Sequence, residues 1–246
     1  MKTKLMIAAM AALIGFSPAA KAEDLVTEKD LGGKFSVNVA LASEYFYRGI
    51  TQSGRGNPAI QGGVDFNHKT GLYVGNWNSS INFGGNIESD FYGGWSGELG
   101  SSKINLNVGA LLYHYPSSKG NEKLDYWEAY AGLSKDLGFA NGMVKFSYSP
   151  DWTGTTKSDA QYLEAGLDVP MGKFFTLNLH AGHQWFEDNS STTGTSTDDY
   201  THYSLAVSFG LAGLGMKVGW MNNDIPSTQS GGKQMGRLFA IVSKTF

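Results

Sequence analysis

The segment 237–246 reads Arg-Leu-Phe-Ala-Ile-Val-Ser-Lys-Thr-Phe and has the pattern of a β-strand that continues to the final residue. Leu238, Ala240 and Val242 fall on one face of this strand, together with Phe246. An exposed terminal strand with unpaired backbone groups invites aggregation unless another strand covers it. Pairing of the last strand with the first one would leave no open edge. The segment therefore predicts a closed β-barrel.

Alternation with a period of two extends along the chain from Lys34 onward, as in Phe35, Val37 and Val39. Successive side chains of a strand point to opposite faces of a sheet, so this spacing predicts strands. Glycine (33 of 246 residues) and aromatic residues (13%) also favour an all-β protein over a helical one. We expect an antiparallel up-and-down barrel of about twelve strands, at 34–48, 59–67, 72–83, 88–99, 103–115, 125–134, 142–149, 160–169, 174–186, 200–210, 214–222 and 236–246.

The connections between these segments alternate in length. Tight turns are expected at 68–71, 100–102, 170–172 and 211–213, and long polar connections at 51–58, 116–124, 150–159, 187–199 and 223–235. Two connections fit less well, because 84–87 is short where a long one is due and 135–141 is intermediate. Outer-membrane barrels have short periplasmic turns, longer extracellular loops and an even number of strands. The alternation therefore favours a membrane barrel with both termini on the periplasmic side.

The N-terminal region has the pattern of a secretory signal. Lys2 and Lys4 precede an apolar run over 5–16, and Ala20-Lys21-Ala22 resembles a cleavage site. The apolar run is shorter than the roughly 20 residues that a membrane-spanning helix needs. We expect a signal peptide at 1–22, a short periplasmic segment at 23–33 and the barrel at 34–246.

Charge and cysteine content exclude other classes of protein. Loss of the signal peptide would lower the formal charge from −3 to about −6, because three lysines leave with it. We expect no nucleic-acid partner, since the chain lacks a basic balance. The absence of cysteine argues against a disulfide scaffold and against Cys-ligated metal sites.

A soluble β-sandwich would also alternate apolar and polar residues, with the apolar faces forming its core. Two patterns favour the membrane barrel. The apolar faces carry no charge across their centres, where Lys or Arg in lipid would cost about 2–4 kcal/mol. Tyr45, Tyr47, Trp77, Trp127, Trp185 and Trp220 fall towards the long connections, as expected of an interfacial aromatic belt. The opposite faces hold Glu44, Arg48, Asp65, Glu88, Asp90, Glu98, Glu128, Lys145, Glu164, Asp168, Lys217 and Arg237.

Several stretches resemble the TorF-type porin family of proteobacteria, most densely over residues 34–130. They are 42–53 (Ala-Ser-Glu-Tyr-Phe-Tyr-Arg-Gly-Ile-Thr-Gln-Ser), 58–65 (Pro-Ala-Ile-Gln-Gly-Gly-Val-Asp), 71–77 (Gly-Leu-Tyr-Val-Gly-Asn-Trp), 113–116 (Tyr-His-Tyr-Pro) and 126–128 (Tyr-Trp-Glu). The resemblance implies a barrel in the cell outer membrane, after export, with lipid as its surroundings. The terminal Phe246 is similar to the last residue of bacterial outer-membrane strands, which implies recognition by the barrel-assembly machinery.

Enzyme and metal motifs give little support to other functions. No Walker loop, His-Glu-x-x-His or Gly-x-Ser-x-Gly occurs, and the Ser-x-x-Lys at 230–233 lacks its companion motifs. His180 and His183 are three residues apart, which places them on opposite faces of a strand. Asp188, Asn189, Asp198 and Asp199 could gather calcium, although solvated loop polarity explains them as well. We expect no cofactor, no metal site and no enzymatic activity.

Arg48 is the leading candidate for a functional side chain. With Arg237 and the carboxylates of other strands it could form a transverse field that orients polar solutes. The alternative is an ion pair within the wall, for instance between Arg48 and Glu44, that merely satisfies the two charges. The candidate pore-lining residues are Arg48, Arg237, Glu44, Glu88, Asp90, Glu128 and Glu164.

The favoured function is passive diffusion of small hydrophilic solutes, with a mild preference for cations because luminal acids outnumber bases. Two alternatives stay open: an outer-membrane enzyme acting at the barrel rim, and a closed structural or adhesive barrel. Twelve strands give a lumen of intermediate width, which inward side chains could narrow or block. The inward aromatic residues are Phe46, Tyr92, Tyr130 and Phe186.

Overall fold

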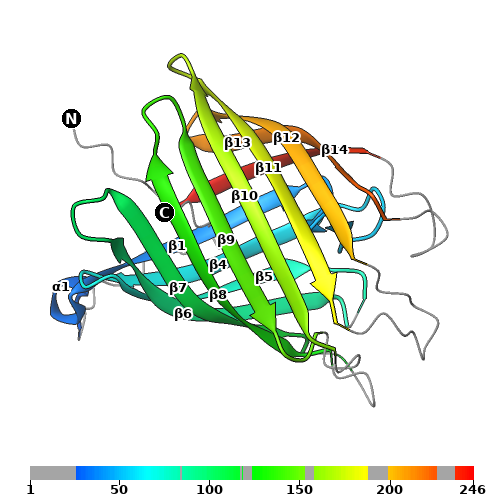
Figure 1. Ribbon diagram of the computed structural model, residues 1–246, viewed down its shortest axis with the longest axis horizontal. Helices are drawn as coiled ribbons and strands as arrows, with labels where there is room; N and C mark the ends of the chain where they lie inside the picture. The colour runs from blue at the N-terminus through cyan, green and yellow to red at the C-terminus, as the bar shows by residue number, and fades with distance from the viewer. Residues whose placement is uncertain are drawn as a thin grey trace, which may run out of the picture.

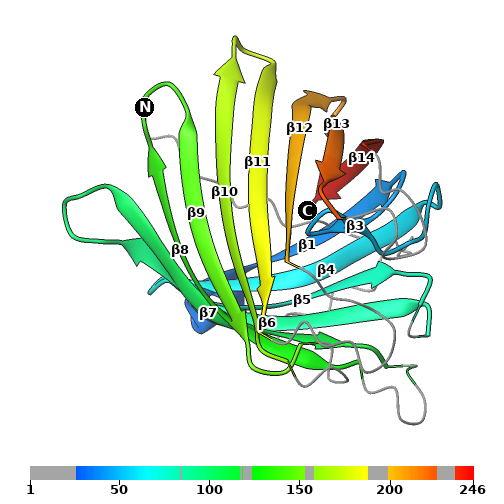
Figure 2. The same ribbon diagram turned by 45° about the vertical axis from the view of Figure 1, so that its right-hand side comes forward.

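The computed structural model describes residues 26–83, 85–116, 118, 124–152, 158–187, 199–225 and 236–246. Its long strands form one closed antiparallel barrel, in the order β1-β14-β13-β12-β11-β10-β9-β8-β7-β6-β5-β4 (Figures 1 and 2). The strands are β1 (Gly33–Ala42), β4 (Ala59–His68), β5 (Leu72–Ser80), β6 (Ile87–Glu98), β7 (Ile104–His114), β8 (Tyr126–Asp136), β9 (Asn141–Ser149), β10 (Ala160–Met171), β11 (Phe175–Phe186), β12 (Tyr200–Leu211), β13 (Leu214–Asn223) and β14 (Arg237–Thr245). The predicted all-β, up-and-down barrel of twelve strands is confirmed.

The barrel closes between its first and last strands. Asn38 of β1 pairs with Thr245 of β14, and Ala42 pairs with Ile241. The backbone N–H of Phe246 donates to the carbonyl of Val37 at 3.0 Å. The closure predicted from 237–246 is therefore confirmed, and it leaves neither terminal strand with a free edge.

The two ends of the barrel differ, as the sequence predicts. Tight connections such as 69–71, between β4 and β5, lie at one end, called here the turn end. Long connections such as 43–58, between β1 and β4, lie at the other, called here the loop end. The connection 81–86, between β5 and β6, also belongs to the loop end although it is short. Turn-end and loop-end connections therefore alternate here as they do elsewhere.

A short helix precedes the barrel. In α1 (Glu28–Leu31), Thr27 and Asp30 form a capping box, and Gly32 ends the helix at a positive φ of 66°. Glu28 Oε1 accepts a hydrogen bond from the N–H of Phe35 at 2.7 Å, which ties the helix to β1. The expected signal peptide, 1–22, lies outside the described residues. Among the residues that are described, no helix is long and apolar enough to cross a membrane.

The barrel wall is apolar outside and polar inside. Large apolar side chains such as Ile60 (65% exposed) and Leu238 (77% exposed) face outwards. Buried positions inside hold polar groups, including Gln184 and Asn38. This polarity is the reverse of a soluble sandwich with an apolar core, and it matches a surface that contacts hydrocarbon.

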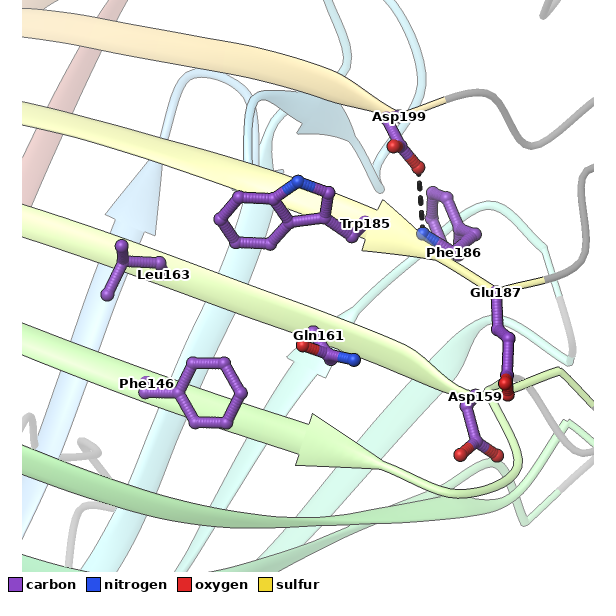
Figure 3. Close-up of a pocket in the computed structure, with 8 residues that line it drawn as sticks. All are labelled: Phe146, Asp159, Gln161, Leu163, Trp185, Phe186, Glu187 and Asp199. Atoms are coloured by element: carbon purple, nitrogen blue, oxygen red, sulfur yellow. Dashed lines mark hydrogen bonds between the residues drawn. The ribbon is translucent and has the colours of Figure 1, made fainter.

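Half of the predicted aromatic belt is in place. Trp127 and Trp185 face outwards near the loop end, and Trp220 packs on the outward ring of Tyr203. Figure 3 shows Trp185 beside Leu163 and Phe146 in a groove on this outer surface. The prediction is wrong for the remaining three residues, because Tyr45, Tyr47 and Trp77 lie inside the barrel, where Tyr45 packs against Trp77 and Tyr47 packs against Tyr113.

The predicted end of the first strand is also wrong. The sequence pattern extends it to Arg48, but β1 ends at Ala42. Beyond that point the chain leaves the wall and forms a small separate hairpin from β2 (Phe46–Tyr47) and β3 (Ile50–Thr51). Alternation of side chains continues through Tyr47, which is why the apolar and polar pattern does not show where the strand ends.

Candidate functional site

The candidate site is built around residues 46–51, called here the inner hairpin. Its two strands pair through Phe46 with Thr51 and Tyr47 with Ile50, which leaves Arg48 and Gly49 at the tip. Both tip residues have positive φ, 45° and 81°. Positive φ at both central positions is the mark of a type I′ turn, whose twist suits a two-residue hairpin. The turn thus places Arg48 at the most advanced point of a segment that lies inside the barrel.

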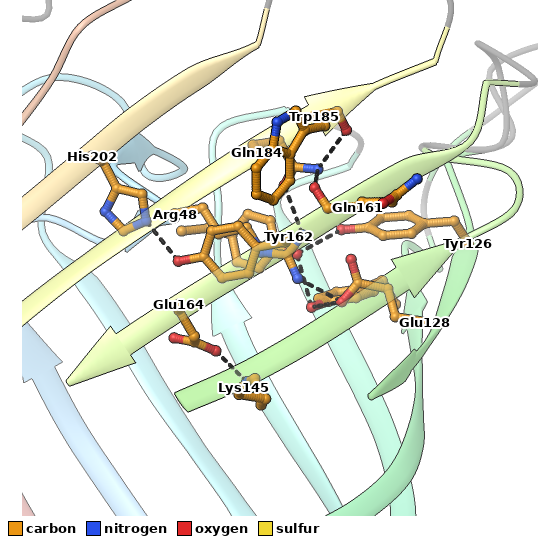
Figure 4. A network of polar contacts seen from close by, with 12 residues as sticks. Arg48, Tyr126, Glu128, Lys145, Gln161, Tyr162, Glu164, Gln184, Trp185 and His202 are labelled. Atoms are coloured by element: carbon orange, nitrogen blue, oxygen red, sulfur yellow. Dashed lines mark hydrogen bonds and ion pairs between the residues drawn. The ribbon is translucent and has the colours of Figure 1, made fainter. Parts of the chain in front are cut away.

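The guanidinium of Arg48 is enclosed on several sides. Its Nη2 donates to Glu128 Oε2 at 2.6 Å, and its Nη1 donates to Gln184 Oε1 at 2.9 Å (Figure 4). Its Cζ lies 4.0 Å from the ring centroid of Tyr162 and 5.3 Å from that of Trp152. The side chains of the ion pair are only 7% and 3% exposed. This is a desolvated ion pair supplemented by cation–π contacts.

Other contacts fix the inner hairpin to opposite parts of the wall. Tyr47 Oη donates to Tyr113 Oη of β7 at 2.9 Å. Across the lumen, Asn223 Nδ2 of β13 donates to the carbonyl of Gly49 at 2.8 Å. Phe46 packs on Phe239 of β14, with ring centroids 6.3 Å apart. The hairpin is therefore braced against the wall on both sides rather than lying along one strand.

Tyr45 anchors the start of the hairpin. It belongs to the connection 43–58, and its hydroxyl donates to Glu88 Oε1 at 2.8 Å. Burial raises the pKa of Tyr45 well above its ordinary value, and the carboxylates of Glu88 and Asp90 raise it further. The phenol therefore keeps its proton and acts as a stable donor to Glu88.

Arg237 has a different partner from Arg48. It forms an ion pair with Glu44, which also accepts a hydrogen bond from the N–H of Gly56 at 3.0 Å. The example given for the alternative, an Arg48–Glu44 pair, is therefore wrong, although both arginines are ion-paired with luminal carboxylates as that alternative requires. The two arginines belong to two separate pairs, one at the tip of the inner hairpin and one at the base of the connection 43–58.

Carboxylates without a basic partner gather on β4 and β6. Glu88 accepts from Tyr45 and also from Tyr115 Oη at 2.8 Å. Asp65 accepts from Tyr92 Oη and from Asn38. Asp90 Oδ1 is buried and has no hydrogen-bond partner within the described part of the chain. Among the described residues none of these three carboxyl groups forms an ion pair, so this side of the lumen holds acidic side chains without a basic partner.

Basic groups lie on other strands of the wall. Lys145 Nζ of β9 lies 2.6 Å from Glu164 Oε1, and His180 Nε2 of β11 lies 2.8 Å from Glu164 Oε2. Glu164 is thus compensated, unlike Asp90. The luminal acids therefore differ in their partners: Glu128 of β8 and Glu164 of β10 are ion-paired, whereas Asp65, Glu88 and Asp90 of β4 and β6 are not, within the described residues.

The described residues offer no site for metal chemistry, because no group of three or more His, Cys, Asp or Glu side chains there is placed to hold an ion. His180 lies inside and bonds Glu164, whereas His183 lies outside against Trp185, as their spacing predicts. Asp199 accepts from the N–H of Phe186. The other members of the calcium alternative, Asp188, Asn189 and Asp198, lie outside the described residues.

Sequence reasoning missed the residues that receive Arg48. Tyr162 and Gln184 pair directly across β10 and β11, and Trp152 follows β9. Alternation predicts that Tyr162 and Gln184 face inwards, but it does not predict what they contact. The sequence does contain a signal for the hairpin that carries Arg48. Gly49, Gly54 and Gly56 follow the aromatic run in quick succession, and such glycine density is typical of turns rather than of a continuing strand.

Comparison with known proteins places the chain in a family. A family model described as "Bacterial protein of unknown function (Gcw_chp)" matches residues 27–246, so the chain belongs to the Gcw_chp family. This match does not carry the TorF-type name. No curated protein matches the sequence.

Solved structures of small porins share the fold. The KdgM porin superposes with a TM-score of 0.58 at 9% identity, over 86% of this chain and 99% of KdgM. The NanC porin gives a TM-score of 0.57 at 9% identity, over 85% and 97% of the two chains. KdgM in complex with disordered oligogalacturonate gives 0.56 at 8% identity, over 87% and 99%. At such identities the likeness establishes the barrel architecture alone.

Proposed function

We propose that this member of the Gcw_chp family is an outer-membrane channel of the TorF type for small hydrophilic solutes. The observation that carries the proposal is the reversed polarity of the barrel, with an apolar exterior around an interior lined by charged side chains. A lumen dedicated to solutes needs such groups, whereas a purely structural barrel of this width could be filled with apolar ones. The shared fold of the KdgM and NanC porins supports the same conclusion.

The uneven luminal charge supports a preference for cations. Three luminal acids are matched by ion pairs with Arg48, Arg237 and Lys145. The carboxylates of Asp65, Glu88 and Asp90 face no such partner within the described residues and would attract cations. KdgM has been crystallised with oligogalacturonate, a polyanion. The acid excess here argues for a different class of solute.

The inner hairpin is the proposed constriction of this channel. Around it, Glu128 and Tyr162 are each 2% exposed, and Gln184 is 0% exposed. Such burial also favours the second candidate, a barrel that its first connection keeps permanently closed. The channel and the closed barrel differ in whether the inner hairpin can leave the lumen.

Export and assembly complete the proposal. Cleavage after residue 22 would release the signal peptide, leaving 23–33 on the periplasmic side of the barrel. Phe246 is 61% exposed while its backbone pairs with β1, so its ring lies on the surface, where the barrel-assembly machinery would recognise it. Lipid would then contact the exposed outer surface.

Recording from planar bilayers tests the channel directly. Purified, folded protein should give stepwise conductance, and its reversal potential in a KCl gradient should show K⁺ passing more readily than Cl⁻. Absence of conductance both from the wild type and from variants that release the inner hairpin would leave the closed barrel as the function. Preference for Cl⁻ would contradict the role assigned to Asp65, Glu88 and Asp90.

A further inference from the structure

The side chain of Arg48 is held in the manner of a bound ligand. Its two terminal nitrogens donate in different directions, one to the carboxylate of Glu128 and the other to the amide oxygen of Gln184. Aromatic rings of Tyr47, Tyr162 and Trp152 lie within 4.0–5.3 Å of its Cζ. Polar acceptors in the plane and rings over the faces are the arrangement that a guanidinium prefers.

Both acceptors belong to the wall and have hydrogen-bond partners there besides Arg48. Glu128 lies on β8, and its Oε2 also accepts from Tyr113 Oη at 3.3 Å. Gln184 lies on β11, where its Nε2 donates to the carbonyl of Gln161 at 2.9 Å. That bond orients the amide so that its oxygen points at Arg48 (Figure 4). Glu128 and Gln184, which line the pocket around Arg48, thus have wall contacts that would remain if Arg48 were removed.

A hydrogen bond fixes the ring of Tyr162 as well. Its Oη lies 2.7 Å from Nε2 of His202, whose ring is nearly parallel to that of Tyr162, with the centroids 5.8 Å apart. The ring therefore offers a flat, preorganised surface to whatever occupies the pocket. Preorganised sites lose less free energy on binding, because their side chains are already ordered.

We propose that this pocket is a receptor for the guanidinium group of a solute, and that Arg48 occupies it as a tethered competitor. The inference rests on the proposed channel function and names its solute class: small cationic molecules that carry a guanidinium group, such as alkylguanidines. A guanidinium fits better than an ammonium, since two acceptors at fixed angles suit a planar fork and not a point charge. The carboxylates of Glu88 and Asp90 would draw such cations towards the pocket.

The test is calorimetric titration of ethylguanidinium into the detergent-solubilised Arg48→Ala protein. Ethylguanidinium reproduces the end of the missing side chain, whereas ethylurea has a similar shape without the charge. We expect saturable binding of ethylguanidinium to Arg48→Ala, at least tenfold weaker binding of ethylurea, and at least tenfold weaker binding of ethylguanidinium to the wild type, whose pocket is filled. Adding Glu128→Gln to Arg48→Ala should abolish binding.

Arg237→Ala is the matched control. It also removes an arginine from a luminal ion pair, but within the described part of the chain Arg237 has no aromatic ring over its guanidinium. We expect no saturable binding of ethylguanidinium to it. Equal binding to Arg237→Ala, or equal binding of ethylurea to Arg48→Ala, would overturn the receptor, as would no binding to folded Arg48→Ala. If Arg48→Ala does not fold, Arg48→Met, which keeps most of the aliphatic stem, takes its place with the same outcomes.

This result is separable from the channel function. If Arg48→Ala binds ethylguanidinium but neither it nor the wild type conducts ions, the receptor stands and the channel fails. If both proteins conduct and neither binds ethylguanidinium, the channel stands and the receptor fails.

Discussion

The lumen at the loop end differs from the lumen at the turn end. Along β8 the inward side chains pass from buried Tyr126 and Glu128 to half-buried Tyr130 and exposed Asp136. Along β10 they pass from buried Tyr162 to exposed Pro170. The wall contributes to this difference, because its inward side chains near the loop end include the packed rings of Tyr113 and Tyr126. The inner hairpin adds to it, because its side chains cover only the inward positions near the loop end.

This difference separates two tasks within one barrel. The turn end keeps water-accessible polar groups, as an aqueous vestibule would. At the loop end, charged residues lose their hydration and require partners, which Arg48, Glu128 and Gln184 provide for one another. Arg48 forms the only ion pair of the inner hairpin among the described residues, so we expect the loss of this pair to weaken the hold on the hairpin more than the loss of any other single contact.

Removing Arg48 should have the largest effect on stability. Arg48→Ala leaves the carboxylate of Glu128 buried without a cation, which typically costs about 3–5 kcal/mol. Arg237→Ala should cost less, about 1–3 kcal/mol, since Arg237 is 23% exposed and Glu44 keeps its bond from Gly56. Denaturant unfolding in detergent measures both. A smaller loss for Arg48→Ala than for Arg237→Ala would contradict the central place given to Arg48.

Gly49→Ala should release the inner hairpin while leaving Arg48 in the chain. A Cβ at Gly49 would lie 2.5 Å from the Cβ of His202, and the φ of 81° is itself costly for alanine. Gly56→Ala is the control, because Gly56 has a similar φ of 74° but nothing within 4 Å of the added Cβ. Trypsin should cleave after Arg48 at least several-fold faster in Gly49→Ala than in Gly56→Ala. Equal rates would show that the hairpin does not depend on this close approach.

Asp65→Asn should have the smallest effect, confined to ion selectivity. Asp65 accepts hydrogen bonds from Tyr92 and Asn38, which favour its charged form, and it has no basic partner within the described residues, so its neutralisation removes attraction for cations without breaking an ion pair. We expect the K⁺ preference in reversal-potential measurements to fall modestly with little change in stability. Lys145→Gln should shift the preference in the opposite direction, because it frees Glu164. A change of the same sign in both variants would contradict the assigned charge pattern.

Much of the fold could be predicted from the sequence because a strand in a barrel wall shows a simple alternation of apolar and polar residues. Alternation identifies the strands, and the segment 237–246 requires a partner that only β1 could supply. The end of β1 could not be found in this way. Tyr45 and Tyr47 continue the apolar alternation, yet backbone pairing stops, and side-chain pattern does not record which hydrogen bonds a backbone makes.

The candidate site was less accessible to sequence reasoning. Alternation correctly places Glu128 and Glu164 inside the barrel, but the partner of each depends on which loop enters the lumen. Arg48 is identifiable from the sequence because it is a charged residue near the end of the first predicted strand. Gln184 and Tyr162 are not, because a neutral amide and a phenol are common on inward faces. Convergence of three strands on one side chain is a property of tertiary structure alone.

The closure of the loop end by the inner hairpin is tested most directly by single-channel conductance of Arg48→Ala beside the wild type, in the same bilayer and salt. Release of the hairpin should raise the conductance or the open time at least several-fold. An Arg48→Ala protein that forms a folded barrel yet conducts no better than the wild type would show that the hairpin does not close the lumen.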